Sequence, residues 1–504
     1  MTKPIVWSVA GSDSGGGAGI QADVQAIQAT GAHACTVISA ITAQNSVAVT
    51  LIEPTREGAF SAQLKALADD LPPAAIKIGM LAYAHQAQML VDCIGELKRQ
   101  GLHPWVIWDP VLVASSGAHL GQIDFSQSAF ADLLALTHVL TPNLPELAAL
   151  TQLPVSTFAQ QQQAVQTLLV QGAAHVLVKG GHADDALATD TLFSAELSWR
   201  FSLPKLVTPH VHGTGCTLSS ALASFMAQGY VAEDAICLAK AYVQQGLAKA
   251  EALGKGAGPV GQGHFDVENI TLPEVSLSTD DAGLSRLKFA PINPRQWGLY
   301  PVLDSSDWVA RVLQAGVRCV QLRIKAASSQ QQLRAEIRRA VELGKQYKAM
   351  VFINDHWQLA IELGAYGVHL GQEDLARADL HAIAAAGLRL GISTHGYAEL
   401  LRAKALKPSY LALGHIYPTQ SKQMPSAPQG LKRLANYVSA CEAIPTVAIG
   451  GISLARVDDV LATGVGAVAM ITAITLSDDP DATIHTLLAK TNRHAGVARE
   501  PAYV

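Results

Sequence analysis

Charged residues are scarce in this chain, and none of them is gathered into a block of one sign. They make up 15% of 504 residues, and the formal net charge is −5. Nucleic-acid binding requires a basic surface, which this balance does not supply. Basic runs never exceed a few residues, so the sequence gives no support for binding to a membrane surface. We therefore expect neither nucleic acid nor a membrane among the partners.

Paired cysteines and long apolar runs are also missing. The six cysteines are scattered and form no Cys-x-x-Cys pair, which excludes a cysteine zinc site or a disulfide framework and fits a reducing compartment. No run of 18 apolar residues occurs, so no transmembrane helix is predicted. The first ten residues lead into a glycine loop and lack the apolar core of a signal peptide. We expect a cytoplasmic protein.

What the chain does contain is apolar sequence in a regular rhythm. Hydrophobic residues make up 49% of it, enough for buried parallel sheets. Within residues 1–265, short apolar runs alternate with segments of helical period, which predicts a doubly wound, mostly parallel sheet. Buried strands are expected at 5–10, 35–41, 75–80, 106–112, 138–140 and 175–179, followed by an edge hairpin at 189–203 and helices at 214–229 and 232–250.

A second, shorter rhythm begins near Trp297. Five glycines and a proline crowd residues 254–263, and residues 266–294, which show no clear period, are predicted as a linker. In residues 295–504, eight βα units predict a closed (β/α)₈ TIM barrel. Its strands are expected at 297–303, 317–324, 349–354, 367–370, 389–393, 410–414, 445–450 and 466–471.

The stretch from His212 to Cys216 contains Gly213 and Gly215 directly before a predicted helix. Glycines let backbone N–H groups turn inward, and a helix start adds unpaired N–H groups and a positive dipole end. This combination predicts a cup for an oxyanion such as a phosphoryl group in transfer, with Cys216 at its mouth. The alternative is a tight turn with a buried cysteine.

Other polar residues of the first domain lie at predicted strand ends. Asp13 and Asp23 flank a glycine loop without P-loop or dinucleotide spacing, and they would offer carboxylates to a small substrate. The alternative is a flexible turn with a helix-capping aspartate. At the ends of later strands stand Asp109, Asn143, Glu146 and Lys179. Each alone reads as a cap or surface charge, but together they favour Mg²⁺ and phosphate binding at the ligand crevice.

The barrel carries its polar residues at the same kind of position. Arg323 and Lys325 are two residues apart, which places both on one face of an extended chain and suits a diphosphate. Asp355 and Asp374 follow the next two strands and predict a Mg²⁺ site facing these cations. Gly451 and the turn after Ile471 are placed like barrel phosphate loops. Ordinary loop charges, the alternative, do not explain this confinement to strand ends.

Seven motifs of the first domain together resemble the hydroxymethylpyrimidine/phosphomethylpyrimidine kinase family. They are Ala-Gly-Ser-Asp-Ser-Gly-Gly-Gly-Ala-Gly-Ile-Gln-Ala-Asp at 10–23, Thr-Ala-Gln-Asn at 42–45, Lys-Ile-Gly-Met at 77–80, Asp-Pro-Val at 109–111, Thr-Pro-Asn-Leu-Pro-Glu at 141–146, Val-Lys-Gly-Gly-His at 178–182 and His-Gly-Thr-Gly-Cys-Thr at 212–217. The resemblance implies a ribokinase-like α/β/α fold and ATP as phosphoryl donor. It also implies a pyrimidine pocket lined by Gln44, Asp23 and Met80.

In the same family comparison Cys216 takes the position of the catalytic base. A thiolate there is plausible because a helix N-terminus lowers a thiol's pKa. One departure is visible: His210-Val211 stands where the family commonly has Asn-Thr. This difference affects the expected contacts of the loop before the cup, but not the cup itself.

The second domain closely resembles thiamine-phosphate synthase. The resemblance implies a pyrimidine-diphosphate site made by Gln321, Arg323, Lys325, Asn354, Ser393 and Lys422. It implies a thiazole-phosphate site made by Thr419, Ser421, Gly451, Ile471 and Thr472, and Mg²⁺ on Asp355 and Asp374. The departures are His415 for a usual proline, Ser421 for threonine and Thr472 for serine, and the last two keep a hydroxyl.

The hypothesis is therefore a bifunctional enzyme of thiamine biosynthesis, with small-molecule substrates and, from the habit of both families, a homo-oligomeric assembly. The kinase would phosphorylate 4-amino-5-hydroxymethyl-2-methylpyrimidine and then its monophosphate, and the synthase would join the diphosphate to 4-methyl-5-(2-phosphoethyl)thiazole. A kinase for pyridoxal or a related alcohol is one alternative. A protein that binds thiamine precursors without turnover is another.

Overall fold

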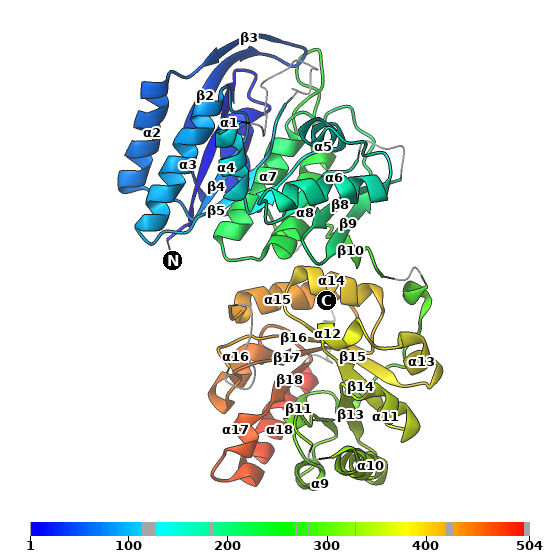
Figure 1. Ribbon diagram of the computed structural model, residues 1–504. Helices are drawn as coiled ribbons and strands as arrows, with labels where there is room; N and C mark the ends of the chain where they lie inside the picture. The colour runs from blue at the N-terminus through cyan, green and yellow to red at the C-terminus, as the bar shows by residue number, and fades with distance from the viewer. Residues whose placement is uncertain are drawn as a thin grey trace. The chain divides into compact units, whose positions relative to one another are not determined.

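A computed structural model describes residues 2–112, 127–181, 186–267, 270–280, 283–327, 329–419 and 427–497. The chain divides into two compact units, Met1–Thr279 and Asp280–Val504. Figure 1 shows one unit built around an open sheet and the other around a closed ring of strands.

The first unit is a ten-stranded sheet between two layers of helices. Its strands are β1 (Ile5–Asp13), β2 (His33–Gln44), β3 (Val49–Pro54), β4 (Ala75–Ile78), β5 (Trp105–Trp108), β6 (Val139–Leu140), β7 (Val176–Val178), β8 (Leu187–Phe193), β9 (Ser198–Pro204) and β10 (Glu274–Leu277). They lie in the order β10-β9-β8-β7-β6-β5-β4-β1-β2-β3. The six strands expected to be parallel, β1, β2, β4, β5, β6 and β7, are parallel. The expected hairpin of β8 and β9 forms, but its predicted place at the sheet edge is wrong because β10 pairs with β9 outside it.

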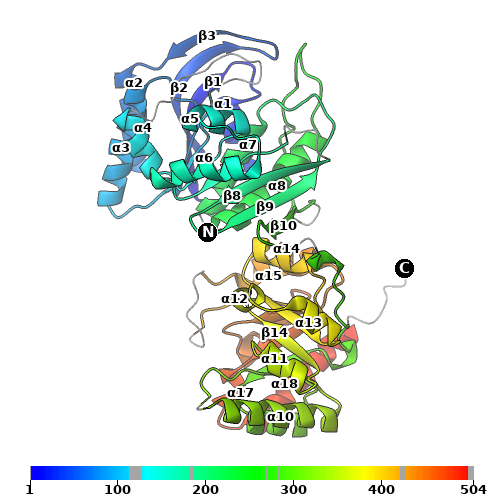
Figure 2. The same ribbon diagram turned by 45° about the vertical axis from the view of Figure 1, so that its right-hand side comes forward.

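Helices cover both faces of this sheet, as Figures 1 and 2 show. They are α1 (Gly19–Ala29), α2 (Glu57–Asp70), α3 (Ala84–Arg99), α4 (Ser128–Ala135), α5 (Leu144–Thr151), α6 (Phe158–Val170), α7 (Thr214–Ala227) and α8 (Ala232–Ala248). The five helices from α2 through α6 pack on one face of the central strands and share an apolar core with them. Helix α7 packs on β1, β4 and β5 and against α1 and α8. The predicted three-layer α/β/α architecture is confirmed.

The segment predicted as a linker contains ordered structure that belongs to the first unit. Strand β10 pairs antiparallel with β9. The glycine-rich residues before it fold back: Phe265 is buried and packs edge-on against Phe225 and Tyr242. Part of the predicted linker therefore belongs to the sheet of the first unit, because residues 274–277 add a strand beside β9.

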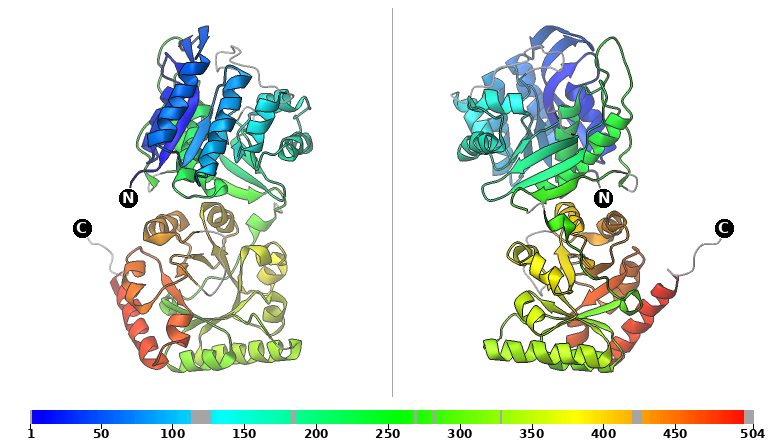
Figure 3. Two further views of the ribbon diagram at one scale, coloured as in Figure 1. Left: turned by 60° about the vertical axis from the view of Figure 1, so that its left-hand side comes forward. Right: turned by 90° about the vertical axis from the view of Figure 1, so that its right-hand side faces the viewer.

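The second unit is a closed barrel of eight parallel strands, which confirms the TIM barrel (Figure 3). The strands are β11 (Leu299–Leu303), β12 (Cys319–Leu322), β13 (Met350–Asn354), β14 (Gly367–Leu370), β15 (Arg389–Thr394), β16 (Tyr410–Gly414), β17 (Thr446–Ile449) and β18 (Ala467–Met470). Each pairs with the next, and β18 pairs with β11. Tyr300, Phe352 and Tyr410 belong to the core cluster and stack edge to face.

Helical segments alternate with these strands. They are η2 (Leu284–Arg286), η3 (Pro294–Gln296), α9 (Ser306–Gln314), α10 (Gln330–Tyr347), α11 (Trp357–Glu362), α12 (Gln372–Leu375), α13 (Leu380–Ala385), α14 (Tyr397–Ala405), α15 (Gly430–Cys441), η4 (Leu454–Arg456), α16 (Val457–Leu461), α17 (Thr472–Thr475) and α18 (Pro480–Val497). Helix α9 shows why they form: Ser305 caps its first turn, and Val309, Val312 and Leu313 recur at helical spacing and are buried. Parallel strands separated by helices bring all eight carboxyl ends to one rim.

Candidate active sites

The cup predicted at residues 213–216 forms at the start of α7. Gly213 is its N-cap with φ 81°, and a side chain on Gly213 would place Cβ 2.0 Å from the Gly17 carbonyl oxygen. Only glycine fits this left-handed position against a neighbouring loop. Among the described residues, the N–H groups of Gly215 and Cys216 have no hydrogen-bond partner. The helix therefore presents two unpaired donors, as an anion site requires.

Cys216 stands half-buried in this cup, and its pKa is opposite to the sequence prediction. Burial raises the pKa of the thiol to about 11, and the carboxylates of Asp23 and Asp109 add to the rise. The Lys77 ammonium and the Gly19 N–H lower the pKa of the thiol, but by less than burial and the two carboxylates raise it. The prediction of a lowered pKa was wrong because loss of solvation outweighs the helix N-terminus.

Asp109, Lys179 and Glu146 meet beside the cup, as their strand-end positions predicted. Asp109 Oδ1 accepts hydrogen bonds from Lys179 Nζ at 2.6 Å and Thr141 Oγ1 at 3.1 Å. Lys179 Nζ lies 3.6 Å from Glu146 Oε2. Burial opposes the charged lysine, but the two carboxylates outweigh it and raise the pKa of Lys179. Burial, with Asp109 beside it, raises the pKa of Glu146 against the influence of Lys179.

Asn143 supports this group from the backbone. It is the N-cap of α5, where its Oδ1 accepts the Glu146 N–H and Glu146 Oε2 accepts the Asn143 N–H, both at 2.8 Å. This capping box fixes the Glu146 carboxylate. A backbone bridge joins Asn143 to Lys179. The structure shows the capping alternative for Asn143 and Glu146, and their part in binding Mg²⁺ and phosphate stays a prediction.

Asp23 lies beneath the cup with no exposed surface. Its carboxylate accepts two bonds from Lys77 Nζ at 2.8 Å, one from Ser8 Oγ at 2.6 Å and one from Ser220 Oγ at 2.7 Å. Burial disfavours the Lys77 ammonium, but Asp23, with Cys216 and Asp109, raises its pKa. Asp23 therefore fastens α1 and α7 to β4. A lysine inside the apolar strand run 75–80 signals in the sequence that a buried acid must lie near it, but it does not say which acid.

Asp13 organises the glycine loop. Its carboxylate accepts N–H groups of Gly15, Gly17 and Ala18 at 2.8–3.1 Å, and His212 Nε2 lies 3.2 Å from Oδ2. Burial acts to raise the pKa of Asp13, but the His212 and backbone bonds prevail and lower it. The loop N–H groups thus point to Asp13, which ties the glycine loop to the segment that enters the cup.

Gln44 and Met80 lie at the other end of this loop. Gln44 ends β2, and its backbone N–H and carbonyl both bond the Ser14 hydroxyl. Met80 is buried, with its sulfur beside Gly11. The departure at His210 is accommodated locally, because its Nδ1 accepts the Gly258 N–H at 3.1 Å. His212 pairs with Pro259 in a short parallel bridge.

The predicted metal pair and cation of the barrel converge. Lys325 Nζ lies 3.1 Å from Asp355 Oδ2. Burial raises the pKa of Asp374, and the charge of Asp355 and a hydrogen bond between the two carboxyls raise it further. Asp355 adopts φ 63°, a conformation that is costly for a non-glycine residue and is held by the surrounding structure. Two neighbouring acids of this kind would suit a cation.

A buried chain of side chains crosses the barrel between Gln321 and Ser393. Gln321 Nε2 donates to Tyr300 Oη at 3.3 Å, and Tyr300 and Tyr410 hydroxyls lie 2.5 Å apart. The His369 ring links Tyr410 Oη at 2.7 Å to Ser393 Oγ at 2.8 Å. Sequence reasoning missed both tyrosines and the histidine, since one tyrosine in a buried strand looks like packing.

The pKa of His369 is shifted by burial and by nearby charges. Burial lowers its pKa to about 4, Arg323 acts in the same direction and Asp355 acts against it. Asn354 is buried at the end of β13, directly before Asp355. Of the four expected rim residues, Lys325 pairs with Asp355 and Asp374 lies beside Asp355, while the place of the Arg323 side chain stays a prediction.

The phosphate loops occupy the remaining strand ends. Gly451 has φ 64° and would place a Cβ 2.4 Å from the Pro418 carbonyl oxygen, so it lies directly against the loop that carries Thr419. Thr472 begins α17 directly after Ile471. Ser421 and Lys422 lie outside the described residues. His415 is buried against Gly450, and its Nδ1 has no hydrogen-bond partner within the described ranges.

The described ranges contain no group of three or more His, Cys, Asp and Glu side chains arranged for a metal ion. The acid pairs Asp355–Asp374 and Asp109–Glu146 nevertheless suit Mg²⁺, which commonly takes one or two carboxylates and completes its shell with substrate phosphate and water. None of the helices described is long and apolar enough to cross a bilayer.

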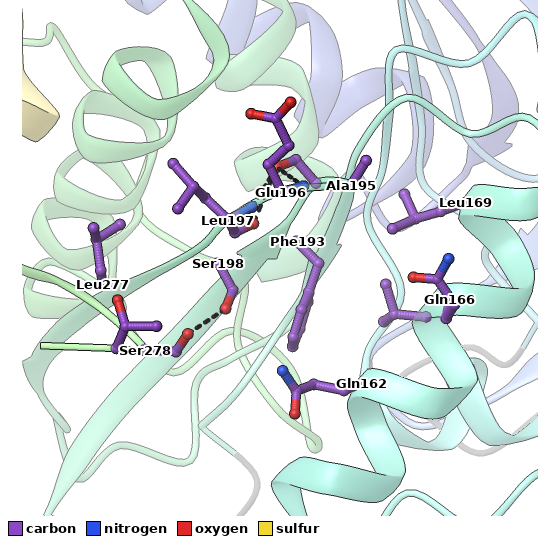
Figure 4. A pocket seen from close by; sticks show the side chains of 13 residues that line it. Gln162, Gln166, Leu169, Phe193, Ala195, Glu196, Leu197, Ser198, Leu277 and Ser278 are labelled. Carbon is purple, nitrogen blue, oxygen red and sulfur yellow. Dashed lines mark hydrogen bonds between the residues drawn. The ribbon is translucent and has the colours of Figure 1, made fainter. Parts of the chain in front are cut away.

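A cavity of about 220 Å³ lies elsewhere in the first unit, between α6, the β8–β9 turn and the end of β10. Figure 4 shows Gln162 and Gln166 on one side of it and the Ser198–Ser278 hydrogen bond on the other. No predicted site residue lines it, and we assign it no part in the chemistry.

Two family models match the chain. That for phosphomethylpyrimidine kinase matches residues 13–261, and that for thiamine monophosphate synthase matches residues 299–474. A thiamine-phosphate synthase of Yersinia pestis (strain Pestoides F) is 61% identical over 189 residues, which cover 38% of this chain and 87% of the relative. The chain belongs to both families. It joins an N-terminal phosphomethylpyrimidine kinase unit to a C-terminal thiamine-phosphate synthase unit.

Two solved structures resemble the kinase unit. A phosphomethylpyrimidine kinase from Clostridium difficile is 33% identical, with 48% of this chain and 99% of that chain covered and a TM-score of 0.41. A pyridoxal kinase from Staphylococcus aureus in complex with ADP is 24% identical, with 55% and 99% covered and a TM-score of 0.48. The two family matches, and not the solved structures, show that the chain carries the kinase and synthase activities of thiamine biosynthesis.

Proposed function

We propose that the kinase unit transfers phosphoryl groups from ATP first to the hydroxymethyl oxygen of 4-amino-5-hydroxymethyl-2-methylpyrimidine and then to its monophosphate. One observation supports the site above all. A Cβ on Gly215 would lie 3.3 Å from Lys179 Nζ and 3.4 Å from Asp109 Oδ2. Unpaired backbone donors, a cation and a carboxylate therefore meet at one point, where charge develops during phosphoryl transfer.

Each residue then has a role in the proposal. The N–H groups of Gly215 and Cys216 hold the moving phosphoryl group, and Lys179 neutralises its charge. The Cys216 thiolate takes the proton of the attacking hydroxyl. Gln44 reads the hydrogen-bonding edge of the pyrimidine, and Met80 packs against the ring. Asp23 and Asp13 are buried and their carboxylates are already bound within the protein, so instead of offering them to the substrate, as predicted, we assign them to holding the cup and the glycine loop in place.

Mg²⁺ belongs to both halves of the proposal. Asp109 and Glu146, with Asn143 fixing the latter, would hold it in the kinase, and Asp355 and Asp374 would hold it in the synthase. It would supply positive charge to the phosphate oxygens. Burial and the neighbouring Asp355 raise the pKa of Asp374, and a divalent cation between the two acids would offset this repulsion.

We propose that the synthase unit binds the pyrimidine diphosphate through Gln321, Arg323, Lys325, Asn354, Ser393 and Lys422. Thr419, Ser421, Gly451, Ile471 and Thr472 would bind the thiazole phosphate. Arg323 and Lys325 draw negative charge onto the departing diphosphate. The bond between the pyrimidine methylene carbon and the diphosphate oxygen breaks, the methylene carries positive charge, and the thiazole nitrogen then forms the new carbon–nitrogen bond, releasing pyrophosphate.

A coupled assay tests the proposal. The purified chain, supplied with ATP, Mg²⁺, the pyrimidine alcohol and thiazole phosphate, should form thiamine phosphate. Cys216→Ala should abolish this reaction and leave it intact when pyrimidine diphosphate is supplied directly. Unchanged turnover from the alcohol would remove Cys216 from the mechanism.

Pyridoxal is the competing alcohol for the kinase unit. The family match over residues 13–261 favours the pyrimidine, and competition between the two alcohols decides. Phosphorylation of pyridoxal in preference to the pyrimidine would reverse the assignment. Binding of precursors without any turnover would instead identify a sensor.

The six cysteines are free thiols, in keeping with the reducing compartment we propose, the cytoplasm. We also propose a homo-oligomer, on the resemblance to both families alone. Sedimentation of the purified chain at its monomer mass would contradict this.

A further inference from the structure

Ser393, which we propose binds the pyrimidine diphosphate, is held from two sides. His369 contacts its hydroxyl at 2.8 Å. Gln372, on α12, donates from Nε2 to the Ser393 carbonyl oxygen at 2.7 Å. The first contact fixes the side chain and the second fixes the backbone from which it projects.

Gln372 is in turn bound to an ion pair. Arg402 Nη1, on α14, lies 3.4 Å from Gln372 Oε1. The same guanidinium donates from Nη2 and Nε to the two carboxylate oxygens of Asp280 at 2.7 and 2.9 Å. A path of hydrogen bonds therefore runs from Asp280 through Arg402 and Gln372 to the backbone of Ser393.

This ion pair is shielded from water. The Arg402 side chain is 9% exposed and that of Asp280 is 20% exposed. A forked arginine–carboxylate pair fixes direction as well as distance, and it is worth most where solvent is excluded. Arg311 and Asp481 form the same fork on the surface of the same unit, at 44% and 54% exposure. They provide a matched control of equal chemistry with no link to Ser393.

Asp280 lies far in the sequence from the other residues of this hydrogen-bond path. Asp280 is the first residue of the synthase unit and follows Leu277, the last residue of β10, by three positions. Helices α12 and α14 both pack on β15, the strand that contains Ser393. Three separate segments of chain are thus fastened at one point behind the proposed pyrimidine site.

We propose that Asp280 and Arg402 are positioning residues of the synthase, which act on the pyrimidine diphosphate site through Gln372. The inference rests on the proposed role of Ser393. Arg402 orients the Gln372 amide so that its Nε2 faces the Ser393 carbonyl, and Asp280 holds Arg402 in place. Loss of either charge frees Gln372 to rotate, and the Ser393 hydroxyl then meets the substrate less often in its binding orientation.

The test uses the full chain with supplied pyrimidine diphosphate and thiazole phosphate. Arg402→Leu should raise KM for pyrimidine diphosphate about tenfold, and Asp280→Asn should raise it about threefold. KM for thiazole phosphate and kinase turnover should stay within twofold of wild type. Arg402→Lys keeps the charge but loses the fork, and should fall between wild type and Arg402→Leu. Arg311→Leu should match wild type in every parameter.

Ser393→Ala separates the two levels of the proposal. If Ser393→Ala raises KM for pyrimidine diphosphate but Asp280→Asn and Arg402→Lys do not, the positioning role is overturned and the substrate assignment stands. If Ser393→Ala changes nothing, the proposed site itself fails. A loss of kcat with both KM values unchanged would show general damage and would also overturn the positioning role. Asp280→Asn, at the exposed end of the path, keeps the test valid if Arg402→Leu fails to fold.

Discussion

The raised pKa of Cys216 makes a quantitative prediction about the kinase. A thiol whose pKa rises from 9.0 to about 11 has lost about 3 kcal/mol of thiolate stability, since each unit is worth about 1.4 kcal/mol. At pH 7 only roughly one enzyme molecule in ten thousand then carries the thiolate. If the thiolate is the base, kcat/KM for the pyrimidine alcohol reports this free-enzyme ionisation.

The rate should therefore climb about tenfold per pH unit between pH 7 and 9, roughly a hundredfold in all, without levelling off. Cys216→Asp should respond differently. An aspartate in this site is expected to remain ionised above pH 7 even if burial and neighbouring acids raise its pKa by three units. Its profile should be nearly flat over the same range.

The measurement is initial-rate kinase kinetics from pH 6.5 to 9.5, with synthase turnover of the same sample as the check for unfolding. A wild-type plateau at or below pH 8 would contradict the high pKa of Cys216. A Cys216→Ala variant that retains both the rate and the slope would contradict its role as base. Either result would refute the reasoning about the cup.

Three further predictions concern buried or paired charges. Asp374→Asn removes one of the two acids, so half-saturation of synthase turnover by Mg²⁺ should need about tenfold more metal; an unchanged titration would remove Asp374 from the site. His369 has its pKa lowered to about 4 by burial, so the folded state resists protonation. The free energy of unfolding that this residue contributes is complete above pH 6.5 and declines as pH falls from 6.5 to 4, by about 3 kcal/mol in all. Urea unfolding of His369→Gln should lack this acid slope. Lys77→Met leaves the buried Asp23 carboxylate without its cation and should destabilise the kinase unit by about 3–5 kcal/mol, measured as a lower calorimetric transition temperature. Adding Asp23→Asn should restore part of this stability. No loss of stability in Lys77→Met would contradict a buried charged pair.

The architecture was readable from the sequence because it rests on local periodicity. The run 410–414 is apolar on both faces, which is typical of a strand covered by helices. Parallel strands then place their carboxyl ends together, so the meeting of Asp109 with Lys179 and of Lys325 with Asp355 followed without knowledge of distances.

The rest could not be read, because it depends on what distant segments do to each other. The pKa of Cys216 is raised chiefly by burial in the folded unit, which outweighs the helix N-terminus that the sequence indicated. Asp23 and Lys77 are 54 positions apart, and nothing local indicates that they pair. The tyrosine hydroxyls between Gln321 and Ser393 look in the sequence like ordinary core residues.

Strand β10 decides where the chain can be truncated to produce the kinase unit as a separate fragment. Its four residues cover the outer edge of β9, with Val275 opposite Phe201. A fragment that stops at residue 265 would leave the N–H and C=O groups along that side of β9 without partners, and bare strand edges recruit further strands from other molecules. A fragment that stops at residue 279 keeps the cover. The first should precipitate or self-associate on expression, and the second should stay dispersed.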